Sequence, residues 1–510
     1  SDLAYWTTAK MREAIHTSKA VGDYAVTKQG LITGNNNLFL RRWHEISESN
    51  IGRLINSRLN ARASGKRWFP CVKGGDFRKW YGNNTFVVDW ENDGERIRSY
   101  IDSDGFLLSR PQNMDHYFKE GMSWTTLTIG TFSMRWCPCG SVFESKGSMC
   151  FANDPNQLMY LLAFFNTNLV NIFLRASSPT LDYHEGPVAR LPLRIVNQNA
   201  VIALAKDAVQ ISKTDWDAFE ASWDYQSSPL LAASLKAANV SLSWQNWQTH
   251  CTSQIMRMQE LETENNRLFI EAYGLQDEMT PEVPEDQITL ARANREADMK
   301  HLISYAIGCM MGRYSLDQKG LVYAQSGNIG FDHSKYKGFP ADDDGIVPVL
   351  DMDWFEDDAA YRFEHFLKVA WQPETLEENL KFVADSLSAK SGETPRDTIR
   401  RYISTQFFKD HLQTYKKRPI YWLFSSGKQR AFECLVYLHR YNESTLSRMR
   451  NEYVTPLQGK LAARADFLAN EIEAAATTSA RSKLQKQLDT IKKKRVELAA
   501  FDDLLRHYSD

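Results

Sequence analysis

Hydrophobic and polar positions follow two different patterns along the chain. From Val21 to about Phe151, short apolar or alternating runs such as NTFVVDW and TLTIGTF are separated by turn sequences such as KGG, ENDG and DSDG. This pattern is typical of strands joined by tight turns. Residues 1–20 have helical spacing instead. We therefore predict a lead-in helix over residues 1–20 and a β-rich domain over residues 21–200.

The later residues have mostly helical spacing. Residues 156–177, NQLMYLLAFFNTNLVNIFLRAS, follow a plausible start at Asp154 and Pro155 and predict one buried helix. Residues 201–445 predict a helical domain with a glycine-rich interruption. Leucines and isoleucines at near-heptad spacing predict a helical hairpin or short coiled coil over residues 446–510. The expected fold class is mixed α/β (α+β).

Charge and aromatic residues are concentrated near the start of the chain. The 510 residues exceed what one hydrophobic core usually serves, and the net charge is only −2. Residues 1–88, however, contain 14 Lys and Arg against 6 Asp and Glu, a net of +8, and six tryptophans lie between Trp43 and Trp136. Basic and aromatic residues together are typical of nucleic-acid binding. A solvated basic face over an aromatic core fits the same residues equally well.

The sequence contains no motif of a self-contained enzyme. No two glycines are separated by one residue, so a Gly-x-Gly dinucleotide loop is excluded, and there is no P-loop, His-Glu-x-x-His or Gly-x-Ser-x-Gly motif. All 16 prolines are isolated, which excludes the Pro-Pro loop of base-modifying amino-methyltransferases. Cys137 and Cys139 are too close for typical zinc ligands. We expect no cofactor, metal site or catalytic residue in this chain.

No targeting or membrane signal is present. No apolar run approaches the roughly 18 residues that a membrane span needs, and the first 20 residues lack the apolar segment of a signal peptide. The seven scattered cysteines argue against a disulfide framework. These observations predict a cytoplasmic protein with no membrane partner. The roles of Cys137 and Cys139 and of the acidic residues 341–345 are left unassigned.

Several segments together resemble one family. GLITGNNNLFLRRW, RWFPCVKGGDFRKWYGN and RPQNMDHYFKEGMSWTTLTIGTFSMRW are similar to the target-recognition domain of adenine-specific DNA methyltransferases. NRLFIEAYGLQDE, DGIVPVLDMDWFEDDA and KKRPIYWLFSSGKQRAFECLVYLHRYNESTLSRMRNEYV resemble the C-terminal part of the PglX family, the methyltransferases of BREX phage-defence systems. The resemblance implies a parent enzyme whose N-terminal domain binds S-adenosylmethionine and transfers the methyl group. This chain would supply sequence-specific DNA recognition and be inactive alone.

The resemblance places the DNA contacts in three segments. Arg and Lys read guanine or neutralise phosphate, Asn reads adenine, hydroxyls bond phosphate or base edges, and glycines let the backbone approach closely. A plain Gly–Asn turn, solvated arginines and strand caps explain the same residues without DNA. The candidate residues are Thr33, Gly34, Asn35, Asn36, Asn37, Arg41 and Arg42; then Lys73, Gly74, Gly75, Arg78 and Lys79; and finally Ser123, Thr125 and Arg135.

The expected partners are double-stranded DNA and the missing N-terminal methyltransferase domain, with other BREX proteins and acidic DNA-mimic phage inhibitors as further candidates. Two alternatives stay open. The chain could be a separate specificity subunit of a restriction–modification system, although such subunits usually repeat their recognition domain and no internal repeat is evident. It could also be a helical interaction scaffold that does not bind DNA. The recognised DNA sequence and the oligomeric state cannot be deduced from the residues.

Overall fold

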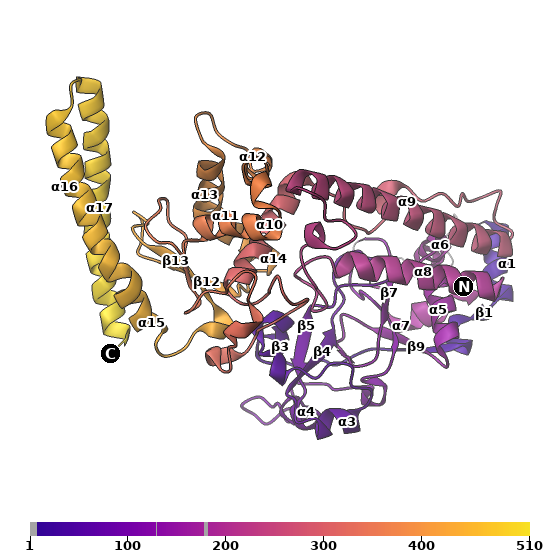
Figure 1. Cartoon of the computed structure of the whole chain (residues 1–510). Helices are drawn as coiled ribbons and strands as arrows, with labels where there is room; N and C mark the ends of the chain where they lie inside the picture. The colour runs from indigo at the N-terminus through magenta and orange to yellow at the C-terminus, as the bar shows by residue number, and fades with distance from the viewer. Residues whose placement is uncertain (1–7, 129, 178–181, 510) are drawn as a thin grey trace. The chain divides into compact units, whose positions relative to one another are not determined.

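The chain divides into two compact units in the computed structural model, which describes residues 8–128, 130–177 and 182–509 (Figure 1). Unit 1 comprises Ser1–Tyr225 and Gln248–Ala293, and unit 2 comprises Gln226–Trp247 and Asn294–Asp510. Helices hold 51% of the residues and strands 12%, so the predicted mixed α/β class is confirmed. The long helix α9 (Val240–Ala272) contributes residues to both units. The domain boundaries proposed from the sequence remain a prediction.

Unit 1 contains two four-stranded sheets, as the β-rich pattern predicts. The first has the order β2-β9-β6-β7 and is antiparallel throughout; the second has the order β3-β5-β4-β8, with β4 and β8 parallel. The strands of unit 1 are β1 (Lys19–Ala20), β2 (Ala25–Lys28), β3 (Leu40–Arg42), β4 (Trp68–Val72), β5 (Phe86–Asp89), β6 (Gly121–Trp124), β7 (Met134–Cys137), β8 (Val142–Phe143), β9 (Met149–Ala152) and β10 (Pro192–Leu193).

Short helices connect these strands, and longer ones cover the first sheet. Residues 1–7 of the predicted lead-in helix lie outside the described residues, and the helix begins after Thr8, whose side chain accepts a hydrogen bond from the amide of Met11. The helices of unit 1 besides α9 are α1 (Ala9–Thr17), α2 (Asn36–Phe39), α3 (Arg58–Ala63), α4 (Glu91–Arg98), α5 (Pro155–Phe165), α6 (Asn168–Ser177), α7 (Glu185–Ala189) and α8 (Gln198–Trp216).

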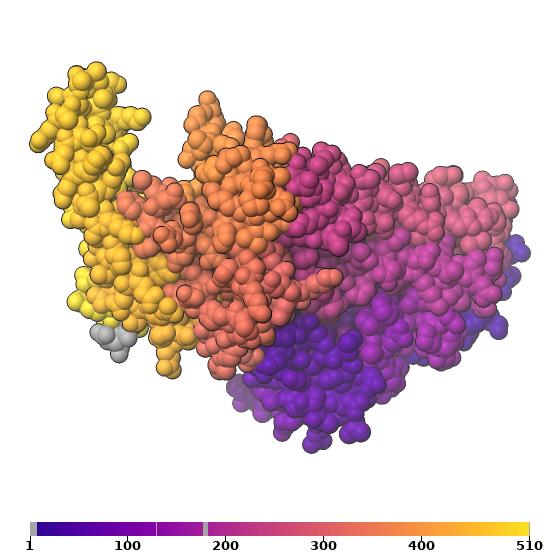
Figure 2. Space-filling view, in the orientation of Figure 1, coloured from indigo at the N-terminus to yellow at the C-terminus, as the bar shows by residue number. Residues whose placement is uncertain are grey.

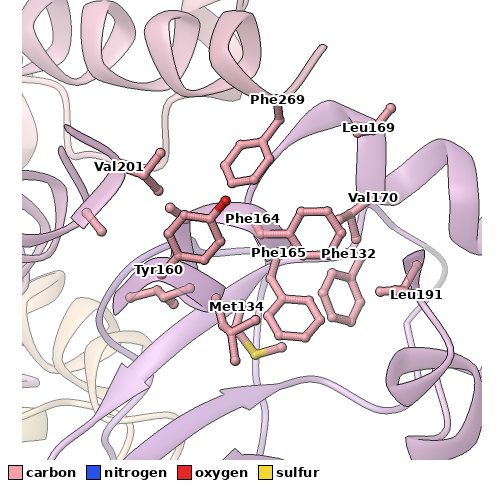
Figure 3. Packing of buried hydrophobic residues seen from close by; sticks show 14 of the residues in the cluster. Phe132, Met134, Tyr160, Phe164, Phe165, Leu169, Val170, Leu191, Val201 and Phe269 are labelled. Carbon is pink, nitrogen blue, oxygen red and sulfur yellow. The ribbon is translucent and has the colours of Figure 1, made fainter. Parts of the chain in front are cut away.

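The main core of unit 1 lies between the first sheet and helices α5, α6, α8 and α9. Figure 3 shows Phe132 and Met134 of the sheet region facing Phe164 and Phe165 of α5 and Phe269 of α9. The start of α5 is as predicted, since the Asp154 carboxylate accepts hydrogen bonds from two amides of the first turn. A second, smaller core lies against the sheet β3-β5-β4-β8. Both sheets are thus backed by packed side chains.

The prediction of one helix over residues 156–177 is wrong, because the chain breaks between α5 and α6 and bends by 72°. The Asn166 side chain accepts from the amide of Met134 and donates to its carbonyl, each over 3.0 Å. Thr167 accepts from the amide of Val170, as a residue that starts a new helix does. Because a buried backbone group without a partner is costly, the hydrogen bonds of Asn166 to Met134 outweigh the loss of a continuous helix.

Unit 2 is largely helical, with the small antiparallel sheet β11-β13-β12. Its strands are β11 (Ile346–Pro348), β12 (Tyr421–Ser425) and β13 (Glu433–Tyr437). Its helices besides the start of α9 are α10 (Arg295–Met310), α11 (Ala359–Ala370), α12 (Leu376–Ser386), α13 (Pro395–Thr405), α14 (Phe407–Thr414), α15 (Thr445–Arg448), α16 (Thr455–Ala474) and α17 (Thr478–Ser509), and a π-helix spans Met449–Val454.

Helices α16 and α17 form a hairpin that extends from unit 2 as an elongated projection (Figure 2). Leu457, Leu461, Leu488 and Leu498 are buried along the contact between the two helices, in a core shared with the sheet. Near-heptad spacing is typical of such a paired helical seam. The helical hairpin tail expected from the sequence is therefore present.

The acidic residues 341–345 form the turn that leads into β11. The Asp342 carboxylate accepts from the amides of Asp344 and Gly345 over 3.0 and 2.8 Å. The Arg440 guanidinium donates to the carbonyls of Asp342 and Asp343 over 2.6 and 3.0 Å. Most of this acidic segment therefore has a structural role, and only Asp343 presents its side chain fully to solvent.

Candidate nucleic-acid interface

Strands β4 and β8 of the second sheet and the segment at Leu31, which is bridged to the residue after β8, run in the same direction and end at one edge. β4 pairs in parallel with β8 through Val72 and Phe143, and Leu31 forms a parallel bridge with Glu144. The amide of Glu144 donates to the carbonyl of Val72 over 2.8 Å, and that of Ser145 donates to the carbonyl of Leu31 over 2.9 Å. Since paired strands lie about 4.8 Å apart, the loops that follow them leave the sheet side by side.

These loops contact one another. A Cβ atom added to Gly74, which has φ +78°, would lie 2.6 Å from the carbonyl oxygen of Lys146. The Thr125 hydroxyl donates to the carbonyl of Gly75 over 2.9 Å. The structure thus brings Lys73, Gly74, Gly75 and Thr125 together with the exposed Lys146, which was not predicted. We call the residues Thr33, Gly34, Arg42, Lys73–Gly75, Thr125 and Ser145–Gly147 the sheet edge.

Two of the predicted cations lie over the same aromatic ring at the sheet edge. Arg42 pairs with Phe86 across β3 and β5, and its guanidinium carbon lies 4.0 Å from the centre of the Phe86 ring. The Lys73 ammonium lies 4.9 Å from the same centre. Arg42 also donates to the Thr85 hydroxyl over 2.6 Å. A cation–π contact orients a cation and leaves its charge in place, so this pair adds positive potential where the loops meet.

The glycine–asparagine turn is fixed by its own side chains. Buried Thr33 donates to the Asn36 side chain over 2.6 Å, and the Asn35 side chain accepts from the amide of Leu38 at the start of α2. Gly34 has φ +77°, and a Cβ there would lie 2.8 Å from a backbone oxygen, so glycine is required. Thr33, Gly34 and Asn35 therefore shape the turn.

The residues after the turn differ in what they can reach. The side chains of Asn36 and Asn37 are exposed. Half-buried Arg41 instead donates to the carbonyls of Asn37 and Leu40 over 2.5 and 2.8 Å, and its guanidinium lies 5.8 Å from the Trp68 ring centre. Of these three side chains, those of the two asparagines are the more exposed.

Arg78 and Lys79 make contacts inside unit 1 instead of facing solvent. Arg78 donates to the carbonyl of Tyr81 over 2.6 Å and pairs with Asp215 of α8 over 2.9 Å. Lys79 is 7% exposed and pairs with Glu262 of α9 over 2.7 Å. Their charges are thus neutralised within the protein, and their positions do not support the contacts with DNA expected from the sequence.

Ser123 and Arg135 are also buried. They face each other across β6 and β7, and Arg135 is only 2% exposed. Arg135 donates to the carbonyl of Arg78 over 3.3 Å and to the Thr125 hydroxyl over 3.4 Å. Burial away from water lowers the pKa of Arg135 to about 10. Arg135 therefore holds the backbone of Arg78 and the side chain of Thr125 in place and does not face solvent.

The part of the chain that the structure describes contains no cluster of metal-binding side chains. Among residues 8–128, 130–177 and 182–509, no group of three or more His, Cys, Asp or Glu side chains is arranged to hold a metal ion. Cys137 is buried, and burial raises the pKa of its thiol to about 12, so it stays protonated at neutral pH. Cys137 is accordingly a packing residue of β7.

Comparison with known proteins identifies two relatives of this chain. No protein-family model matches the chain. The adenine-specific methyltransferase BrxX of Escherichia coli O9:H4 (strain HS) is 41% identical over the whole of this chain, and the adenine-specific methyltransferase PglX of Lacticaseibacillus casei (strain Zhang) is 40% identical over the whole of it. The chain is a homologue of these adenine-specific methyltransferases. It spans about 43% of the length of each. The resemblance stated from the sequence is confirmed.

The length and apolar character of the helices bear on whether any of them could span a membrane. Among the residues that the structure describes, no single helix is long and apolar enough to cross a membrane. The bent pair α5 and α6 meets the test by length and composition only, and its apolar residues belong to the main core of unit 1.

Proposed function

We propose that this chain is the DNA-recognition part of an S-adenosylmethionine-dependent, adenine-specific DNA methyltransferase of a BREX phage-defence system, which marks host DNA. The observation that carries this proposal is the sheet edge, where Arg42 and Lys73 share one aromatic ring beside two glycine-containing loops. Similarity to the adenine-specific methyltransferases BrxX and PglX supports adenine as the base that is methylated.

The sheet edge has the chemistry that such recognition needs. A methyltransferase must extrude the target adenine from the duplex, so the DNA has to be held on both sides of that base. Arg42, Lys73 and Lys146 would neutralise phosphates. Exposed Asn36 and Asn37 would reach base edges, where an amide bonds adenine in a bidentate manner. The positions of the phosphate contacts would then fix the register of the base contacts.

Methyl transfer and S-adenosylmethionine binding would belong to the part of the parent enzyme that this chain does not include, so the chain alone would be inactive. Its partners would be double-stranded DNA, that methyltransferase part and other BREX proteins. An acidic DNA-mimic phage inhibitor would compete for the same cationic edge. Because its substrate is host DNA, the protein would work in the cytoplasm.

Selection from a pool of random duplex DNA across a salt series tests the proposal. Enrichment of one short, non-palindromic word containing an adenine supports it. Asn36→Ala should relax the word at one position, whereas Lys73→Ala should weaken all sequences alike. The matched control is Lys206→Ala, which removes an exposed lysine of α8 whose ammonium donates to Asn156 of α5, and this variant should bind as the unmodified chain does.

Two other results have different meanings. Binding without a preferred word would mean that this chain binds DNA but does not by itself select a sequence. No binding at low salt would contradict the DNA-recognition function and leave an interaction scaffold.

A further inference from the structure

A short hairpin of unit 1 presents four large apolar side chains to solvent. Phe106 is 71% exposed, Leu107 and Ile101 are 54% exposed, and Leu108 is 43% exposed. Single exposed apolar residues are common on protein surfaces, but a cluster on one hairpin marks a contact surface. Phe106 and Leu107 directly follow the turn, and Leu107 pairs with Ile101 across the hairpin. Because successive side chains of an extended strand point to opposite faces, the tip carries apolar side chains on both of its faces.

Hydrogen bonds within the hairpin hold its backbone in a defined shape. Ile101 and Leu107 form an antiparallel bridge, and the amide of Leu108 donates to the carbonyl of Tyr100 over 2.9 Å. Within the turn, the Asp102 carboxylate accepts from the amides of Asp104 and Phe106, each over 2.9 Å. Such an Asx-type turn holds its conformation without a packed core. The apolar tip is therefore preorganised.

The base of this hairpin is continuous with the sheet edge. The amide of Arg110 donates to the carbonyl of Ile32 over 2.7 Å, and a Cβ on Gly34 would meet the backbone oxygen of Leu108. The Tyr100 hydroxyl accepts from the Asn35 side chain over 3.3 Å. The glycine–asparagine turn and the hairpin thus form one piece, so a duplex held along the sheet edge would meet the apolar tip.

We propose that Phe106 and Leu107 are an apolar wedge that inserts between base pairs of duplex DNA bound at the sheet edge. This inference rests on the proposed DNA-recognition function. Apolar side chains inserted at a base step unstack it and kink the duplex, and a base that is already unstacked is easier to extrude. The wedge would lower the cost of extruding the adenine.

The charges of the turn refine the proposal. The Asp102 carboxylate faces the amides of its own turn, whereas the exposed Asp104 carboxylate would lie near DNA phosphates. Exposed Arg110 would offset part of that repulsion. Asp104→Asn should therefore bind DNA more tightly than the unmodified chain, by roughly two- to fivefold at low salt.

The test uses the full 510-residue chain and duplexes that contain the enriched word, with the fluorescent base 2-aminopurine at each adenine in turn. Fluorescence of this base rises when it is unstacked. The unmodified chain should raise the signal at one step and bind a duplex mismatched at that step more tightly than the matched one. The double variant Phe106→Ala/Leu107→Ala should abolish the rise and bind matched DNA roughly tenfold more weakly.

Two further variants distinguish a specific effect of the apolar tip on DNA from a general effect on folding. Phe106→Trp keeps a large ring and should keep the fluorescence rise. Phe467→Ala removes a phenylalanine of α16 that is 51% exposed and should behave as the unmodified chain. If the double variant binds and unstacks DNA as the unmodified chain does, the wedge is refuted and the hairpin is assigned to a protein partner. If the unmodified chain binds DNA without any rise, the wedge fails while DNA recognition stands. If it binds no duplex at low salt, the proposed function itself fails.

Discussion

Replacing Lys79 with methionine separates the two roles considered for this residue. Its sequence context, KGGDFRKWYGN, favours a phosphate contact, whereas the structure places its ammonium 2.7 Å from the Glu262 carboxylate inside unit 1. Methionine keeps most of the side-chain volume and removes the charge. If Lys79 contacts a phosphate, the variant should bind DNA more weakly and unfold at the same temperature. If Lys79 belongs to a buried ion pair, the variant should be less stable and bind DNA with unchanged affinity while it is folded.

The burial of the Lys79–Glu262 pair determines how much stability the variant should lose. Glu262 is 2% exposed, and its other oxygen accepts from the Trp80 indole over 2.8 Å. Without Lys79, this carboxylate would be a buried charge with one neutral donor. Removing one partner of a buried pair costs about 3–5 kcal/mol. For a folding unit of this size each kcal/mol shifts the melting temperature by about 2–4 °C, so we expect Lys79→Met to lower it by about 10 °C.

A double-mutant cycle with Glu262→Gln checks the cause of that loss. Glutamine can still accept from the Trp80 indole and carries no charge, so Lys79→Met/Glu262→Gln should recover roughly half or more of the lost stability. Circular dichroism follows unfolding, and anisotropy of labelled duplex follows binding below the melting temperature. If Lys79→Met has the melting temperature of the unmodified chain and binds DNA more weakly, the role of Lys79 in a buried ion pair is refuted.

Three further substitutions test other parts of the structure. Gly34→Ala forces a Cβ against a backbone oxygen at φ +77° and should cost at least 1–2 kcal/mol, roughly, in thermal unfolding and weaken DNA binding; unchanged stability would contradict the turn geometry. Asn166→Ala leaves the buried amide and carbonyl of Met134 without their side-chain partner and should cost about 2–4 kcal/mol in the same assay. Burial, with Asp342 nearby, raises the pKa of Asp344 to about 8, so the folded chain keeps a proton that the unfolded chain loses near 3.9, and stability falls as the pH rises between these values. Asp344→Asn should flatten that decline in melting temperatures recorded from pH 5 to pH 9, and a parallel decline would contradict it.

The sequence predicted the features that depend on neighbouring residues. Alternating runs between glycine turns identified the strands, Asp154 and Pro155 identified the start of α5, and near-heptad leucines identified the helical hairpin. The break after α5 was missed for a physical reason. Apolar spacing continues through it, and the contact that stops the helix comes from Met134, 32 residues away.

The candidate site was predictable in its chemistry and only partly in its residues. Lys73 and Lys79 occur in one short run and have equivalent charges, yet one lies over an aromatic ring and the other in a buried ion pair. The partners that decide this are distant: Asp215 is 137 residues from Arg78 and Glu262 is 183 residues from Lys79. Lys146 was not among the predicted residues because its place beside Gly74 depends on the parallel pairing of β4 and β8, which no local pattern indicates.

The charge of the first 88 residues therefore overstates what DNA would meet, and salt dependence can measure the difference. Several of these cations pair with carboxylates of unit 1, namely Arg53, Arg58, Arg67, Arg78 and Lys79. Each phosphate neutralised contributes about −0.9 to the slope of log affinity against log salt. A net of +8 would give a slope of about −7, whereas Arg42, Lys73 and Lys146 alone would give about −3.

We expect the measured slope to lie nearer −3 than −7, roughly, and Arg42→Ala/Lys73→Ala to reduce its magnitude by about 2. The exposed control Lys206→Ala should leave the slope unchanged. A steep slope that the double variant does not alter would mean that DNA is held by cations outside the sheet edge. In that case the parallel strand ends of the second sheet would not be the recognition surface, even though the chain would still bind DNA.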